Sequence, residues 1–284
     1  MMKKYLNPVV AGILIASGIV FPSVCYSQGK SAVIRKFLTE LPRGEAKDDG
    51  SPQKYRMTAV YTNRDFYGNF TGKIKVSGDY TRGLQDGFVT WNNVIISNSD
   101  NLTGPFTEDS RQEYMENLKY FPSPQMLNEE TFKDFPASTE NVFARNLVWD
   151  MMTIEMFVWK YSDSLIINKK YFIPDINGEF NMGEIGNYEH SNIQLCWTGI
   201  SVMNDELCGV IEYRAIDNKI KLTMDQINTR GTEQYWGTTW ISLENKQIEY
   251  AEMYSGTIQE IEIKGLKDKI LVKTIRELWV ERIN

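Results

Sequence analysis

Apolar residues recur at two different spacings along the chain, and the spacing changes several times. From Ser31 to Leu41 they lie three or four positions apart, which predicts a short amphipathic helix. Three runs rich in β-branched and aromatic residues then predict strands at Tyr55–Arg64, Phe70–Thr81 and Gly87–Ser97. A second helical pattern is predicted from Asp109 to Lys119.

The clearest helix is predicted from Thr139 to Tyr161. Thr139 can cap its first turn, and apolar side chains cover most of its circumference. A helix of this kind is typical of burial against more than one surface, so it should pack on a sheet. We expect near-complete burial of Phe143, Leu147, Met151, Ile154 and Phe157. The expected exposed edge is the polar stripe of Asn146, Asp150 and Thr153.

From Leu165 onward the chain resembles a β-meander. Segments rich in Val, Ile, Thr, Tyr and Trp alternate with turn-forming pairs at Asn177–Gly178, Gly186–Asn187, Asn204–Asp205, Asp217–Asn218, Glu244–Asn245, Ser255–Gly256 and Lys267–Asp268. We therefore predict an α+β, predominantly β fold. It consists of a large curved antiparallel meander, a half-barrel or open barrel, with a short N-terminal helix and a buried central helix packed on the sheet.

The turns also predict which residues share a face of the C-terminal sheet. Two-residue turns at Glu244–Asn245 and Ser255–Gly256 would pair Ile241 with Ile248 and Thr239 with Tyr250. The expected core face holds Ile241, Ile248, Tyr250, Ile261 and Ile263, joined by Val272, Leu278 and Val280. The expected opposite face holds Trp236, Trp240, Met253, Ile258 and Trp279, with Glu249, Glu260, Glu262 and Glu277.

This second face mixes indoles with carboxylates, and three interpretations remain open. In the first, the face is exposed to solvent and partly covered by the helix. In the second, it is the floor of an amphipathic ligand site, and in the third its tryptophans stack on a bound sugar. The candidate ligand-binding residues there are Trp236, Trp240, Trp279, Glu249 and Glu262. Glu155 is a further candidate, because it lies on the apolar stripe of the 139–161 helix. There it must be paired with Arg or Lys, or have its pKa raised by burial.

The first 27 residues have the features of a signal peptide. Lys3 and Lys4 precede an apolar run of about a dozen residues, which is too short to span a bilayer, and Cys25-Tyr26-Ser27 suits cleavage before Gln28. Export to the periplasm or the extracellular space is therefore expected, with a lipid anchor at Cys25 as the alternative. Residues 28–284 show no break in composition, so we expect a single β-rich domain with a helical segment at about 108–161.

Export would permit a disulfide between Cys196 and Cys208, the two cysteines that follow the leader. A hairpin that turns at Asn204–Asp205 argues against it, because it would hold these cysteines roughly 16 Å apart. Both outcomes therefore remain open. The sequons at Asn69 and Asn101 matter only in a eukaryotic secretory route.

Composition limits the function further. A single His and three Cys argue against most zinc sites and most His-dependent catalytic triads, and we expect no cofactor. The net charge of −6, without a basic stripe, gives no indication of nucleic-acid binding. No later apolar run is long enough to span a membrane as a helix.

No motif identifies a characterised family or a reaction. The predicted architecture is similar in outline to exported half-barrel proteins that shield lipids or acyl chains, although no motif supports that likeness. The favoured hypothesis is an exported, non-enzymatic protein that binds a hydrophobic or amphipathic, lipid-like ligand. The alternative is a carbohydrate-binding module or a carbohydrate-active hydrolase that uses the Trp and Glu face.

Overall fold

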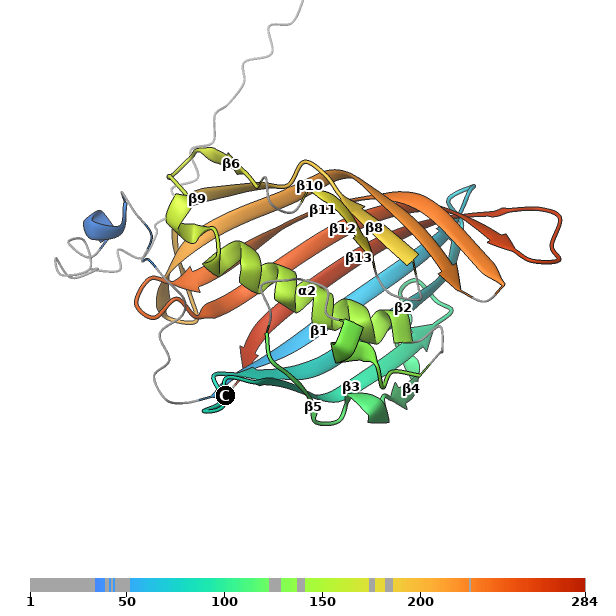
Figure 1. Cartoon of the computed structure of the whole chain (residues 1–284), viewed down its shortest axis with the longest axis horizontal. Coiled ribbons are helices and arrows are strands. Elements are labelled where there is room, and N and C mark those ends of the chain that lie inside the picture. Colours follow the sequence, from blue (N-terminus) through green and yellow to red (C-terminus); the bar gives the residue numbers. More distant parts are fainter. Residues whose placement is uncertain are drawn as a thin grey trace, which may run out of the picture.

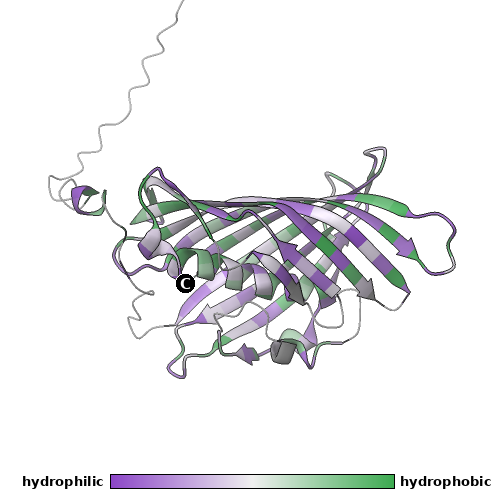
Figure 2. Cartoon of the chain, turned by 45° about the horizontal axis from the view of Figure 1, so that its top comes forward, coloured by the Kyte–Doolittle hydropathy of each residue, from purple (hydrophilic) through white to green (hydrophobic). Residues whose placement is uncertain are grey.

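The structure is a computed structural model that describes residues 34–38, 41, 43, 52–122, 129–136, 141–173, 177–181, 186–224 and 226–283. The described chain is mostly β, with one antiparallel sheet of 13 strands that is not closed and one helix packed on it (Figure 1). The predicted fold class is confirmed. The sheet curves around the helix, so it has an inner face toward the helix and an outer face away from it (Figures 1 and 2).

The elements follow one another as strands, a helical segment, and strands again. The first group is β1 (Gln53–Asp65), β2 (Phe70–Arg82), β3 (Val89–Ser99), β4 (Thr107–Arg111) and β5 (Leu118–Tyr120). The helical elements are the 3₁₀ turns η1 (Glu113–Met115), η2 (Glu129–Phe132) and η3 (Ser162–Ser164) and the helix α2 (Asn141–Trp159). The second group is β6 (Lys170–Phe172), β7 (Gly178–Asn181), β8 (Gly186–His190), β9 (Gln194–Met203), β10 (Glu206–Met224), β11 (Ile227–Ser242), β12 (Ile248–Ile263) and β13 (Ile270–Ile283).

The strand order is β4-β3-β2-β1-β13-β12-β11-β10-β8-β7, with β5 beside β3 and β9 between β10 and β6. The first and last strands therefore lie side by side in the middle of the sheet, paired from Lys54 with Ile283 to Asp65 with Val272. Alternation of polar and apolar residues gives each long strand its two faces. In β1, for example, Tyr55, Met57, Ala59 and Tyr61 are buried and the residues between them are not.

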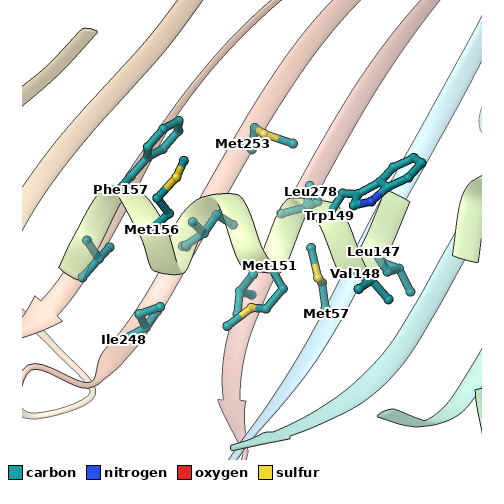
Figure 3. Close-up of a cluster of buried hydrophobic side chains, with 14 of the residues drawn as sticks. Met57, Leu147, Val148, Trp149, Met151, Met156, Phe157, Ile248, Met253 and Leu278 are labelled. Carbon is teal, nitrogen blue, oxygen red and sulfur yellow. The ribbon is translucent and has the colours of Figure 1, made fainter. Parts of the chain in front are cut away.

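Helix α2 lies across the inner face and is buried on nearly all sides. Leu147, Met151, Ile154 and Phe157 are fully buried, as predicted, whereas Phe143 is partly buried with its ring edge-on to Tyr61. Figure 3 shows the helix side chains in one cluster with Met57, Ile248, Met253 and Leu278 of the sheet. The predicted N-terminal helix is seen as a helical turn at residues 34–37. The rest of that prediction falls largely outside the described residues.

The prediction that the polar stripe of α2 is exposed is wrong. Asp150 and Thr153 are buried and Asn146 is half-buried. Asp150 forms an ion pair with Arg276 of β13, and the Asn146 amide donates to the Tyr61 hydroxyl of β1. The stripe therefore faces the sheet, because the sheet supplies polar partners that helical periodicity cannot reveal.

The prediction of a helix from Asp109 to Lys119 is also wrong. This segment forms β4 and the single turn η1, and it then enters β5. β4 and β5 both pair with β3, and Met115 between them is fully buried. Pairing with the backbone groups at the edge of β3 thus stabilises strands here more than a short helical pattern stabilises a helix.

Three predicted turn pairs lie inside strands instead: Asp217–Asn218 in β10, Ser255–Gly256 in β12 and Gly186–Asn187 in β8. Asp217 and Asn218 lie at a bulge in β10, and Asp217 has a positive φ of 64°. Ser255 is buried in β12, where its hydroxyl accepts a hydrogen bond from Arg276. The turn at Asn204–Asp205 is confirmed, with Met203 paired with Glu206 and positive φ at both turn residues.

These differences change three residues of the predicted faces. Ile241 does pair with Ile248, but a bulge follows, so Trp240 rather than Thr239 pairs with Tyr250. Tyr250 consequently lies on the outer face beside Trp240. Met253 and Glu249 lie on the inner face, where both are buried.

Truncation of the helix core tests this packing. Met151→Ala and Phe157→Ala should each lower the free energy of unfolding by about 2–5 kcal/mol, because each removes a fully buried side chain from a close-packed cluster. Leu102→Ala, at an exposed loop position, is the control and should change it by less than about 1 kcal/mol. Urea unfolding measures all three variants. Losses below about 1 kcal/mol in both helix variants would contradict a packed helix.

Candidate functional site

The inner face of the sheet is divided into zones that cross several strands. Beneath α2 lies an apolar zone in which Ala251, Met253, Leu278 and Val280 are buried. The strands then continue beyond the N-terminal end of the helix, as the long β10–β13 ribbons show in Figure 1. The zone where the helix cover ends differs sharply in chemistry from the zone beneath it.

Two adjacent rows of polar residues cross the inner face at this point, and we call them the polar band. One row runs through Asn218, Glu233, Thr257, Thr274 and Asn63, each paired with the next across neighbouring strands. The second row runs through Tyr235, Ser255, Arg276 and Tyr61 in the same way. Because residues paired across strands point to the same face, the band is a direct consequence of strand register.

Arg276 is the centre of the polar band. Its guanidinium lies 2.9 Å from the Asp150 carboxylate of α2 and 3.6 Å from the Glu233 carboxylate of β11. Glu233 also accepts a hydrogen bond of 2.7 Å from the Tyr188 hydroxyl of β8. A cation buried to this degree needs such partners, since an unpaired buried charge is very costly.

Burial shifts the protonation of these groups. It raises the pKa of the Asp150 carboxyl to about 7, and the Arg276 guanidinium works against that rise. Burial also opposes the charge on Arg276, but Asp150 and its other acidic neighbours hold the pKa of Arg276 well above its ordinary value. The Asp150 carboxyl therefore titrates near neutral pH while Arg276 stays charged.

His190, the only histidine of the chain, lies at one end of the band. It is buried against the rings of Tyr188 and Tyr235, with ring centroids 4.7 Å and 6.0 Å away. Burial lowers its pKa to about 4. A strand histidine is more often on the surface, so only the pairing of β8 with β10 could have placed it here.

Within the described part of the chain, two buried polar groups of the band have no hydrogen-bond partner. They are the Tyr235 hydroxyl and the side-chain NH₂ of Asn218, whose oxygen accepts from the Ser191 backbone N–H at 3.0 Å. Buried polar groups are nearly always hydrogen-bonded, so two unpaired groups on neighbouring strands of one band are informative. Both are suited to hold a polar group that arrives from outside.

Beyond the polar band the inner face becomes aliphatic again, and we call this zone the aliphatic end. It consists of Ile220, Leu222, Ile227, Ile261, Ile263, Ile270 and Val272. Cross-strand pairs join Ile227 with Ile263 and Ile261 with Ile270. Unlike the apolar zone beneath α2, most of these side chains are only partly buried.

The structure separates the residues that the sequence grouped as one site. Trp236, Trp240 and Trp279 lie on the outer face, where Trp236 is 48% exposed and stacks on Tyr254 with ring centroids 6.2 Å apart. Glu262 is on the same face, 3.8 Å from Lys269. Glu249 is on the opposite face, so it does not join the tryptophans.

Glu249 and Glu155 are both buried and paired with arginine. The Glu249 carboxylate accepts a 2.6 Å hydrogen bond from Arg282, and burial raises its pKa despite that cation. Glu155 accepts a 2.7 Å hydrogen bond from the Tyr80 hydroxyl and lies 3.5 Å from Arg82. Of the two alternatives for Glu155, the structure shows the paired one.

Cys196 and Cys208 do not form a disulfide; both thiols are free. Cys196 pairs with Glu212 across the β9–β10 hairpin and Cys208 with Ser201, so the hairpin geometry keeps them apart. Burial raises the pKa of the Cys208 thiol to about 12.

The described ranges contain no cluster of three or more His, Cys, Asp or Glu side chains arranged to hold a metal ion. Within the same ranges, no helix has the length and apolar character needed to cross a bilayer.

Opposite pH slopes are expected from Asp150 and His190, the two titrating residues beside the polar band. Asp150 keeps its proton in the folded state up to about pH 7, so its contribution to the free energy of unfolding falls as pH rises from about 4 to 7. His190 resists protonation in the folded state, so its contribution rises with pH from about 4 to 6.5. Between about pH 4 and 6.5 the two therefore cancel in the wild-type chain.

Each substitution should reveal the slope of the residue that remains. Relative to wild type, Asp150→Asn should add a slope of up to about +1.4 kcal/mol per pH unit, and His190→Gln a slope of similar size and negative sign. Urea unfolding at several values between pH 4 and 6.5 measures both. Slopes equal to that of wild type in both variants would show that neither pKa is shifted.

No family model matches the chain, and no curated protein matches it. Among solved structures, one of lipovitellin, described as showing lipid–protein interactions, aligns with 83% of this chain at 10% sequence identity and a TM-score of 0.42. The present chain spans about a quarter of that lipovitellin chain, since the alignment covers 25% of it.

Proposed function

We propose that the protein binds an amphipathic ligand on the inner face of the sheet. The apolar part of the ligand lies over the aliphatic end, and its polar group reaches the polar band. The observation that carries this proposal is the adjacency of partly exposed aliphatic side chains to the two unpaired buried groups of Tyr235 and Asn218.

The aliphatic end favours an apolar chain as the bound group. Ile263, Ile270 and Val272 keep part of their surface in water, although they belong to the face that α2 covers elsewhere. Covering apolar surface yields roughly 25 cal/mol per Å², so a chain laid across these strands is stabilised in proportion to its length. Such contacts are sufficient for a non-enzymatic binding protein, which needs no catalytic residues.

The charges of the polar band favour an uncharged polar group. Asp150 and Glu233 together balance or exceed the single positive charge of Arg276. The unpaired groups, a tyrosine hydroxyl and an amide NH₂, are neutral donors. A hydroxyl or ester of a monoacylglycerol fits this environment better than an ionised carboxylate does, because the carboxylate would meet two acidic side chains.

Access to the band involves the N-terminal half of α2. Asp150 and Asn146 connect this half of the helix to Arg276 and Tyr61. A ligand that reaches the buried Tyr235 hydroxyl displaces the helix locally, at the expense of these two contacts.

Export of the chain is part of the same proposal, because an extracellular or periplasmic protein meets such ligands outside the cell. Residues 1–27 lie outside the described residues. Intact-mass measurement of the secreted protein should show Gln28 as the first residue. A mass that includes a diacylated Cys25 would instead support the lipid-anchor alternative.

The binding proposal is tested with two adjacent residues of β10. Leu222 is on the inner face at the aliphatic end, and Thr223 next to it is on the outer face. Leu222→Glu should weaken the binding of monooleoylglycerol at least about tenfold, because it places a charge where the chain lies. Thr223→Glu, the matched control, should leave the affinity unchanged.

Tryptophan fluorescence titration and calorimetry measure both affinities. Oleate at pH 8 should bind more weakly than monooleoylglycerol to the wild-type protein. The binding proposal fails if neither ligand binds, or if Leu222→Glu binds both as well as wild type.

A second candidate function is carbohydrate binding on the outer face. The half-exposed Trp236, stacked on Tyr254 with an interplanar angle of 21°, offers a flat aromatic surface of the kind that sugars use. Trp236→Ala should abolish any signal on a glycan array if this candidate is right. A signal that persists in that variant would exclude this surface as the sugar site.

A further inference from the structure

Two hairpin tips lie next to each other at the end of the sheet away from the Asn204–Asp205 turn. One is the β1–β2 tip at residues 66–69, and the other is the β12–β13 tip at residues 264–269. They are neighbours because Asp65, just before the first tip, pairs with Val272, just after the second. Figures 1 and 2 show the β12–β13 hairpin projecting beyond the rest of the sheet.

Exposed apolar side chains concentrate on these tips. Phe66 is 71% exposed, Tyr67 85% and Leu266 57%. Ile258 of β12 and Leu271 of β13, on the outer face nearby, are also exposed. Five of the fourteen exposed large hydrophobic residues in the described chain thus lie at this one end, and such a concentration is typical of an interaction surface.

Basic side chains lie immediately behind and between the apolar tips. Arg64 precedes Phe66 by two residues, and Lys264 and Lys267 flank Leu266. In the described part of the chain, neither these residues nor Lys273 form an ion pair with a carboxylate, whereas Lys269 is paired with Glu260. Over residues 64–69 and 262–273, five basic side chains outnumber three acidic ones, so the surface is locally cationic on a chain whose net charge is −6.

Two of these cations oppose each other directly. Arg64 of β1 pairs with Lys273 of β13 on the outer face, and Ile258 of β12 is the next residue in the same row. Like charges directly opposite each other across strands are destabilising unless an anion lies between them. Further along the sheet, Lys73 and Lys75 of β2 lie over the Phe106 ring, with ammonium groups 4.5 Å and 5.0 Å from its centroid.

We propose that this end of the sheet docks on an anionic lipid surface. Phe66, Tyr67 and Leu266 enter the boundary between headgroups and acyl chains, and Arg64, Lys264, Lys267 and Lys273 contact lipid phosphates. The order of residues along each hairpin supports a bilayer, because apolar side chains lead and cations follow, as in interfacial membrane anchors. Anionic headgroups also supply the negative partner that the opposed cations Arg64 and Lys273 lack.

This surface goes beyond the proposed ligand site, and the two stand or fall separately. The docking residues are on the hairpin tips and the outer face, whereas Leu222 and the polar band are on the inner face. Leu222→Glu should therefore leave vesicle binding intact, and a tip variant should leave the binding of dispersed monooleoylglycerol intact.

Vesicle co-sedimentation tests the docking surface. Wild-type protein should bind vesicles of phosphatidylcholine with about 30 mol% phosphatidylglycerol about tenfold more tightly than vesicles of phosphatidylcholine alone, and salt should weaken the binding. The triple variant Phe66→Ser, Tyr67→Ser and Leu266→Ser should lose about tenfold or more of that affinity. The charge variant Lys264→Glu, Lys267→Glu and Lys273→Glu should remove the preference for the anionic vesicles.

The matched control carries three substitutions of exposed apolar residues away from the tips, Ile166→Ser, Phe172→Ser and Val202→Ser, and should bind as wild type. Circular dichroism confirms that each variant is folded. Equal vesicle binding by wild type and the tip variant overturns the proposal, as does equal binding to neutral and anionic vesicles. Failure of wild type to bind either vesicle also overturns it. Self-association that the tip variant abolishes would then assign the surface to a second copy of the chain.

Discussion

An open sheet has no second sheet to cover its inner face, and helix α2 provides that cover. Burial of the helix on nearly all sides removes its polar residues from water, so each must find a partner inside the protein. Asp150, an acidic residue of the helix, finds its partner in Arg276, with which it forms an ion pair. Removal of one partner from a buried pair leaves an uncompensated charge, which is far more destabilising than the net contribution of the pair. Together with the hydrogen bonds of Asn146 to Tyr61 and of Tyr80 to Glu155, this contact holds the helix at one place along the strands.

The sequence was sufficient for the elements with strong periodicity. The alternation in β1–β3 and the apolar circumference of α2 predicted these elements and the fold class. Local turn chemistry was less reliable, because Asp217, Asn218, Ser255 and Gly256 are turn-forming residues that the long ladders of β10 and β12 absorb. When strands pair on both sides, such residues are accommodated within a strand, either at a bulge or in regular extended conformation. Local preference cannot reveal those neighbours.

The polar band illustrates what lies beyond sequence reasoning. Its members come from five different strands, β1, β10, β11, β12 and β13, and they contact Tyr188 of β8 and Asp150 of α2. Each residue taken alone is an ordinary strand residue, and only the register places Tyr235, Asn218 and Arg276 together. The predicted tryptophan face was found because Trp236 and Trp240 are two alternations apart on one strand. Glu249 was misplaced because the bulge beside it shifted the alternation by one residue.

The pairing of β1 with β13 has a consequence for how the protein is made. These strands form the central ladder of the sheet, yet more than 200 residues separate Asp65 from its partner Val272 along the chain. During synthesis, the β1–β5 half and the β6–β12 half can only form separate, incomplete sheets. The ladder that unites them must wait until β13 emerges. Until then both halves expose an unpaired strand edge, and such an edge is prone to pair with other chains.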